Sequence, residues 1–326
     1  MALRPVQVNI KALDHLAVGR FWAAALGWRA HSGETTYVGP AGDSVSHEPV
    51  VVGSDVVPGG PAGEFVWPAP VVVGSDVVPG GPAGEFVWPA PVVVGSDVVP
   101  GGPAGEFVWP EPVDGGKDVV LGGLAGDVVW PDPVVVGIDV VPVPEGKTAT
   151  KNRLHLDLAT TSAAHQAELI ARLRTLGATP VDVGQRDVPW TVLADPEGNE
   201  FCVLEPREVY RDTGPIAAIV VDCVEPRAMA RFWGEAIDWP LQQVSDDHAV
   251  LRGAGPYLEF LRTPGAKTVP DRVHLDLLPY PGDDKDAEVA RLRALGATDL
   301  DLGQGDVPWT CLSDPEGHEF CVLTQG

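Results

Sequence analysis

Histidine, aspartate and cysteine recur in this chain in the same order and at the same spacing. The two sets are His155, Asp157, Cys202 and, 119 residues later, His274, Asp276, Cys321. In each set His and Asp alternate with leucines in the string HLDL, and alternate residues of an extended strand share one face. We therefore expect His and Asp on a polar face and the leucines in the core. Such side chains can transfer protons or bind a divalent metal.

Other polar and aromatic residues fall near these strands. Glu200 and Glu319 lie two positions before the cysteines and should share their face and line the same ligand cavity. Trp190 and Trp309 each follow Asp-Val-Pro, and they either cap a cavity with aromatic surface or pack in ordinary core. The His-Asp pairs either act as proton-transfer groups or only line a wet sheet face. The sequence leaves both pairs of alternatives open.

The elements that must position these residues are duplicated as well. The segments RLHLDL, ARLRTLGAT and DVPWTVLADPEGNEFCVL recur as RVHLDL, ARLRALGAT and DVPWTCLSDPEGHEFCVL. Earlier in each copy, RFWAAALGW at 20–28 recurs as RFWGEAIDW at 231–239, and its apolar residues have helical spacing. Each unit therefore reads as a strand, a helix and further strands. This pattern predicts an α+β fold with helices on one side of a curved sheet.

A repeat array interrupts the first copy. The string VVVGSDVVPGGPAGEFVWPAP at 50–70 is repeated without change at 71–91, and a third copy begins at Val92. We expect a first domain at 1–206 with the array at about 50–133, a linker at 205–215 and a second domain at 214–326. Valine and tryptophan between Pro-Gly turns favour a β-rich insertion, which can also serve as an interaction surface.

The duplicated motifs resemble the vicinal oxygen chelate superfamily, which includes glyoxalases, extradiol dioxygenases and bleomycin-resistance proteins. RFWAAALGW, NRLHLDL, LGAT and DPEGNEFCVL carry the resemblance. It implies two tandem domains of paired βαβββ modules that close around a small-molecule cavity. It also implies a glyoxalase-like binding protein that acts either as a lyase or isomerase or as a ligand-sequestering protein of the drug-resistance type. An interaction protein that works through the array is a third alternative.

The resemblance also implies positions for a divalent metal, with one ligand from the first and one from the last strand of each module. In the first domain these positions are Gln7, Asp139, His155 and Cys202, and in the second they are Ala218, Glu259, His274 and Cys321. Cysteine stands where the family usually has glutamate, and alanine cannot bind a metal, so neither set is complete. We expect His155 and His274 to be the acid–base or ligand residues. The uninterrupted second domain is expected to hold the better site.

Composition limits the partners. The formal net charge of −24 would repel nucleic acid and anionic membrane surfaces, so a small-molecule ligand is expected instead. The four cysteines are scattered without a CxxC pair, which favours reduced thiols. Charged residues interrupt the apolar stretch near the N-terminus, and we therefore expect a cytoplasmic protein. The tandem domains are expected to pair within the chain, and Glu197 and Glu316 are expected to be solvated turn residues.

Overall fold

The computed structural model describes residues 2–40, 119–120, 136–185, 187–302, 304–305 and 307–325. The repeat array and the β-rich insertion expected there lie outside the described residues, except for strand β4 (Val119–Val120). β4 pairs antiparallel with β11 (Leu241–Val244) and forms one edge of its sheet.

Four modules of one plan follow each other along the chain. The first contains β1 (Leu3–Ala12), α1 (His15–Leu26), β2 (Arg29–Ser32), β3 (Thr36–Gly39) and β5 (Gly137–Pro142). The second contains β6 (Leu154–Leu158), α2 (Ala163–Thr175), β7 (Thr179–Pro180), β8 (Thr191–Ala194) and β9 (Glu200–Val203). The third contains β10 (Ile216–Cys223), α3 (Pro226–Ile237), β11 (Leu241–Val244), β12 (His248–Arg252) and β13 (Tyr257–Arg262). The fourth contains β14 (Val273–Pro279), α4 (Lys285–Leu295), β15 (Thr298–Asp299), β16 (Thr310–Ser313) and β17 (Glu319–Val322).

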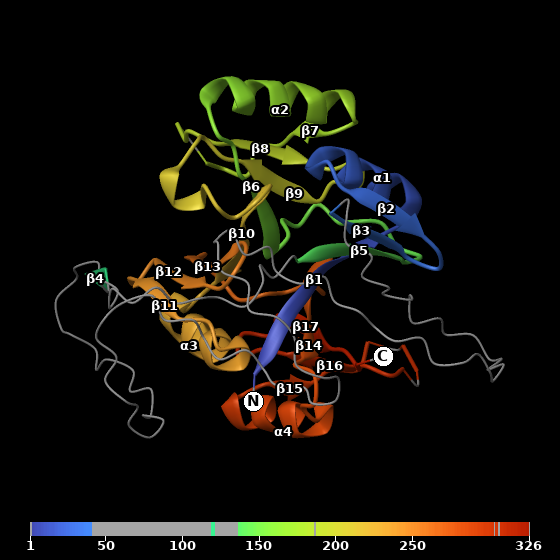
Figure 1. Ribbon diagram of the computed structural model, residues 1–326, viewed down its shortest axis with the longest axis vertical. Coiled ribbons are helices and arrows are strands. Elements are labelled where there is room, and N and C mark those ends of the chain that lie inside the picture. Colours follow the sequence, from blue (N-terminus) through green and yellow to red (C-terminus); the bar gives the residue numbers. More distant parts are fainter. Residues whose placement is uncertain are drawn as a thin grey trace, which may run out of the picture. The chain divides into compact units, whose positions relative to one another are not determined.

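The modules pair into two sheets (Figure 1). Sheet A has the order β15-β16-β17-β14-β1-β5-β3-β2, and sheet B has the order β4-β11-β12-β13-β10-β6-β9-β8-β7. In both sheets the two modules join through their first strands, which run antiparallel: β1 with β14, and β10 with β6. The predicted α+β fold of paired βαβββ modules is confirmed.

Each sheet combines one module from each sequence copy, because the first module pairs with the fourth and the second with the third. The expectation that each copy builds its own cavity is therefore wrong. The reason is the route of the chain. The segments 143–153 and 263–272 cross from one sheet to the other, whereas the linker around η1 (Glu208–Tyr210) joins β9 to β10 within sheet B.

The two modules of one copy still contact each other through their helices, as α1 contacts α2 and α3 contacts α4 (Figure 1). The Trp22 indole packs on Phe201 at 5.1 Å and donates its N–H to Asp195 at 3.3 Å. Trp233 repeats both contacts with Phe320 and Asp314 in the second copy. A buried indole packs against its apolar neighbours, and the hydrogen bond of its N–H holds the ring in one orientation. These tryptophans are core residues, as expected.

The turn glutamates Glu197 and Glu316 also join the two modules of each copy. Glu197 accepts hydrogen bonds from the backbone N–H groups of Leu13 and Asp14, at 2.8 and 2.6 Å, just before α1 begins. Glu316 does the same for Val224 and Glu225 before α3, at 2.7 Å each. The expectation that these side chains are solvated is wrong. A carboxylate next to a helix start satisfies backbone donors that have no partner within the helix.

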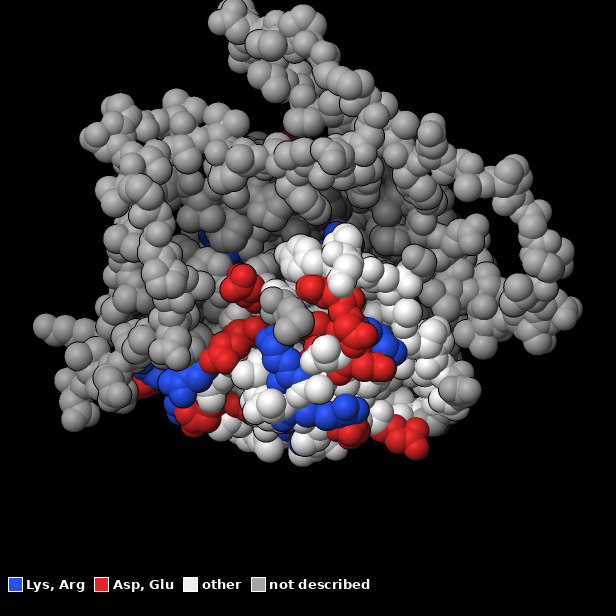
Figure 2. Space-filling view, turned by 60° about the horizontal axis from the view of Figure 1, so that its bottom comes forward, with Lys and Arg blue, Asp and Glu red and all other residues white. Residues whose placement is uncertain are grey.

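The surface at the α4 end of the molecule carries both signs of charge. Figure 2 shows Lys and Arg lying among Asp and Glu on this face. Several of these charges pair with each other, for example Arg293 with Asp299 at 2.7 Å. Among the described residues, no helix is long and apolar enough to cross a membrane.

Candidate functional site

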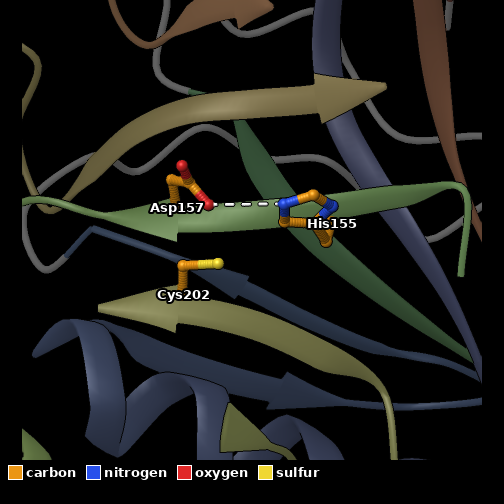
Figure 3. A group of neighbouring side chains, drawn as sticks. All are labelled: His155, Asp157 and Cys202. Carbon is orange, nitrogen blue, oxygen red and sulfur yellow. Dashed lines mark ion pairs between the residues drawn. The ribbon is translucent and has the colours of Figure 1, made fainter. Parts of the chain in front are cut away.

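The first of two polar clusters lies on the face of sheet B opposite the α-helices of the described part of the chain, which we call the helix-free face. The leucines of β6 belong to the core under the helices, and His155 and Asp157 therefore point to the opposite face. β9 runs parallel to β6 and places Cys202 beside Asp157 (Figure 3). His155 Nε2 lies 3.5 Å from Asp157 Oδ1, and one donor atom from each of the three side chains falls within 4.8 Å of the others.

Glu259 from β13 lies on the same face, two strands away from His155. Its Oε1 accepts a 2.6 Å hydrogen bond from the Tyr210 hydroxyl, and its Oε2 lies 3.2 Å from His248 Nε2. Tyr210 comes from η1 in the linker, and His248 begins β12. Two hydrogen bonds fix the Glu259 carboxylate in one orientation.

The cluster is set in apolar surroundings. A second buried group of side chains covers this face of sheet B, separate from the core under the helices; its members include Cys202, Tyr210, Ala218, Val220, Val250 and Tyr257. Binding sites for small molecules commonly combine such an apolar lining with a few placed polar groups. The face therefore has the composition of a ligand site.

Burial sets the protonation of this cluster. It raises the pKa of Asp157 to about 7, and the neighbouring Glu259 carboxylate adds to the increase. It lowers the pKa of His155 to about 4, with a further contribution from Lys151. The pKa of the Cys202 thiol is raised by burial and by Asp157. At neutral pH the imidazole and thiol are therefore uncharged, and Asp157 is divided between its two forms.

Sheet A carries the matching cluster in more polar surroundings. His274 Nε2 lies 3.2 Å from Asp276 Oδ1 and 3.6 Å from Cys321 Sγ. The other carboxylate oxygen, Asp276 Oδ2, accepts hydrogen bonds from Gln7 at 2.8 Å and Asn9 at 3.5 Å. In sheet B the positions of Gln7 and Asn9 are taken by Ala218 and Val220. The two faces therefore differ in polarity.

Two further groups complete the sheet A cluster. Asp139 on β5 lies next to Asn9, and burial raises its pKa to about 6, which Asp276 increases and a hydrogen bond from Thr35 opposes. Cys311 on β16 faces Cys321, with 3.4 Å between the sulfurs. The hydrogen bond from Cys321 lowers the pKa of Cys311 to about 7.

The residues expected at the metal positions form different groups in the structure from those that the sequence predicts. Gln7 and Asp139 join His274 and Cys321 in sheet A, whereas Glu259 joins His155 and Cys202 in sheet B. The expected groupings within each copy are wrong, because each sheet takes its first two positions from one copy and its last two from the other.

Glu200 and Glu319 are buried but serve the connecting segments rather than the clusters. Glu200 binds Lys147 at 2.9 Å, and Glu319 binds Lys267 at 3.4 Å as well as Lys11 of β1 at 2.8 Å. Each glutamate also accepts a hydrogen bond from a backbone N–H near the end of a crossing segment. Glu200 accepts from Asn152, just before β6, and Glu319 accepts from Asp271, just before β14. Trp190 and Trp309 are partly buried and donate to Gln185 and Gln304. The Arg207 guanidinium lies 5.7 Å from the Trp190 ring, a cation–π distance.

The family's metal does not fit its usual positions in this chain. In sheet B the first position is Ala218, which has no ligand atom, and both oxygens of Glu259 are engaged by Tyr210 and His248. In sheet A the Gln7 amide is directed to Asp276 instead. The donors that converge are His, Asp and Cys in each sheet. Within the described part of the chain, His155 Nδ1 and Asp157 Oδ1 lack a hydrogen-bond partner, as do the same atoms of His274 and Asp276.

Three residues of these clusters, Tyr210, His248 and Cys311, have little or no signal in the sequence. Tyr210 sits in the linker, which occurs once, so comparing the copies gives no signal for it. His248 begins a strand whose counterpart in the first copy precedes the array. Cys311 had a signal, because WTCLSD differs from WTVLAD where cysteine replaces Val192.

A cavity of about 350 Å³ also lies between the segments that cross from one sheet to the other. It is lined by the cations Lys11, Lys151, Arg153, Lys267 and Arg272, among others. Each of these is bound to a carboxylate or to backbone carbonyls, as with Lys267 to Asp271 at 3.1 Å and Arg153 to the Gly265 carbonyl at 3.0 Å.

Comparison with known proteins finds a matching family and several solved structures of similar fold. A model of the glyoxalase-like domain matches residues 93–204 and 218–323, more than half of the chain. Two crystal structures of glyoxalase I mutants from Zea mays are each 10% identical over 99% of this chain, cover 94% and 92% of those chains and have TM-scores of 0.51 and 0.50. A glyoxalase-related enzyme from Fulvimarina pelagi is 21% identical over 33% of this chain and 86% of its own, with a TM-score of 0.28.

These structural similarities, at such low identities, concern the fold alone. No curated protein matches the chain. The two domain matches and the four-module architecture agree, and the chain belongs to the glyoxalase-like family of the vicinal oxygen chelate superfamily.

Proposed function

We propose that the helix-free face of sheet B binds a small, partly apolar molecule and moves a proton on it, as a lyase or isomerase does. The observation that carries the proposal is the position of two carboxyl groups, Asp157 and Glu259, in one apolar patch. Buried acidic groups are costly unless they are used or paired, and they concentrate at functional sites.

The lining supports a ligand with an apolar body. Val220, Val250 and Tyr257 offer carbon surface, and His155, Asp157 and Glu259 offer polar atoms beside it. A molecule with a hydrophobic end and one carbonyl or hydroxyl group matches this division. Sheet A has polar groups at the positions of Val220 and Ala218, and it is the weaker candidate for such a ligand.

The protonation states support proton transfer. Near neutral pH Asp157 exchanges its proton easily, because its pKa lies at about 7. Glu259, held by Tyr210 and His248, is placed to take a proton from a bound molecule. Two carboxyl groups in different environments can act as acid and base in one reaction. His155, neutral at this pH, can hydrogen-bond to the polar group of the ligand.

The test uses 2-hydroxyacetophenone, an aromatic ketone with exchangeable protons next to its carbonyl. In deuterium oxide, proton NMR follows the loss of these protons with and without the protein. We expect faster exchange with the native chain and a loss of about 100-fold or more in Glu259→Gln, the range for general acid–base groups. The exposed Glu208→Gln is the matched control. Exchange that is equal in Glu259→Gln and the native chain would contradict the proposal.

A metal-dependent site is a second candidate, favoured by the convergence of His155, Asp157 and Cys202. Zinc accepts all three donor types and leaves a position for a ligand in such a site. Elemental analysis of protein purified without chelators distinguishes the candidates. A stoichiometric metal that is lost in Cys202→Ser supports this one, and metal-free protein that still catalyses exchange removes it. Binding of the ketone without exchange would instead indicate a sequestering protein.

A further inference from the structure

The two clusters differ at one position that matters for sulfur chemistry. On β16, Cys311 lies directly opposite Cys321 of β17. The matching pair in sheet B is Val192 of β8 opposite Cys202 of β9. Sheet A therefore has two thiols where sheet B has one.

The geometry of the pair is close to that of a disulfide. The sulfurs of Cys311 and Cys321 are 3.4 Å apart, and neither cysteine is in a disulfide. Opposite residues of antiparallel strands have Cα atoms about 4.5–5.5 Å apart, within the range that disulfides span. The bonded sulfurs would be about 2.05 Å apart, so they need to approach by little more than 1 Å. Rotation of the two side chains supplies this without moving the strands.

We propose that Cys311 and Cys321 are a reversible oxidation site, at which a peroxide converts the two thiols to a cross-strand disulfide. The bond would take the Cys321 sulfur away from His274 and Asp276 and so dismantle the sheet A cluster. Sheet B would be unaffected, because Val192 cannot form the bond. The inference does not depend on the function proposed for sheet B.

The reaction balances with the peroxide as the only oxidant. The Cys311 sulfur attacks one peroxide oxygen, the O–O bond breaks, and a sulfenic acid forms while the other oxygen leaves as water. The Cys321 sulfur then attacks the sulfenic sulfur, the S–O bond breaks, and a second water leaves with the Cys321 proton. Two thiols are oxidised and hydrogen peroxide is reduced to two water molecules.

The surroundings assign the order of the two steps. Cys311 is only partly buried, whereas Cys321 is 4% exposed, so the peroxide reaches Cys311 first.

The test treats the fully reduced chain with one equivalent of hydrogen peroxide, alkylates the free thiols and measures the intact mass. We expect two of the four cysteines to escape alkylation and dithiothreitol to restore them. A glutamate-specific protease cuts after Glu316 and Glu319, and it should release a peptide pair that joins Cys311 to Cys321. Alkylatable Cys321 in the treated native chain would overturn the proposal, as would Cys311 found only as sulfinic acid.

Two variants sharpen the result. Cys311→Ser should keep all three remaining thiols free of any bond within the chain, and an internal disulfide in this variant would contradict the assignment. Val192→Cys should gain a second disulfide to Cys202, because the facing register is the same in sheet B. If the bond between Cys202 and the new cysteine does not form, facing positions on these strands are not sufficient for a disulfide. That result would contradict the proposal.

Discussion

Replacing Asp157 by asparagine should make the fold more stable, and the gain should grow with pH. The folded chain raises the pKa of this carboxyl from 3.8 to about 7, mainly by burial. The folded state therefore holds the proton more tightly than the unfolded state does. Below pH 3.8 both states are protonated and there is no penalty. Above about pH 7 the folded state must carry a buried charge, and the penalty is complete.

The expected size follows from the shift. A difference of about three pKa units corresponds to about 4 kcal/mol of lost stability at pH 8, falling to about 2 kcal/mol at pH 5. Asp157→Asn has no charge to bury and should escape this loss. The difference in unfolding free energy between variant and native chain should therefore increase by about 2 kcal/mol from pH 5 to pH 8.

Urea unfolding at several pH values, with a chelator present, measures this difference. The chelator keeps a bound cation from compensating the charge of the carboxylate. Asp212→Asn, at an exposed position in the linker, is the control and should stay within about 0.5 kcal/mol of the native chain at each pH. An Asp157→Asn difference that is the same at pH 5 and pH 8 would refute the reasoning, since the carboxyl would then not be buried in its charged form.

Two further predictions concern the assembly of the sites. Tyr210→Phe should lower the unfolding free energy by about 2 kcal/mol, because the hydroxyl donates a buried hydrogen bond to Glu259. Tyr280→Phe, at a half-buried tyrosine that directly follows β14, is the matched control, and equal losses in both variants would show that the Glu259 bond is not responsible. The separate fragment 214–326 should form dimers, because β10 and β14 each lose the strand that pairs with them. Analytical ultracentrifugation distinguishes this from a monomer, which would indicate that β10 can pair with β14 instead.

The sequence predicted the modules well because their evidence is local. Alternating leucines in HLDL predict the buried and polar faces of β6 and β14, and the helical spacing of Phe21, Trp22 and Leu26 predicts α1. The family resemblance assigns His155 and Cys202 to one set of metal positions, and the structure places them on neighbouring strands. These are properties of short segments, in which spacing determines the face.

The partner of each module could not be predicted in this way. β1 has the same alternating pattern whether it pairs with β6 or with β14, so the strand sequence does not choose between them. The choice depends on the crossing segments 143–153 and 263–272, whose path comes from tertiary contacts such as Lys147 with Glu200 and Lys267 with Glu319. The sequence therefore groups Glu259 with His274 and Cys321, whereas in the structure it lies with His155.

The central claim is that the helix-free face of sheet B, assembled from the second and third modules, is the ligand site. NMR of the histidine side chains during titration with 2-hydroxyacetophenone tests it most directly, with the eight histidines assigned by substitution. The ring signals of His155 and His248 should shift together as the ketone binds, and that of His274 should stay in place. Shifts at His274 alone, or at none of the three, would contradict the claim.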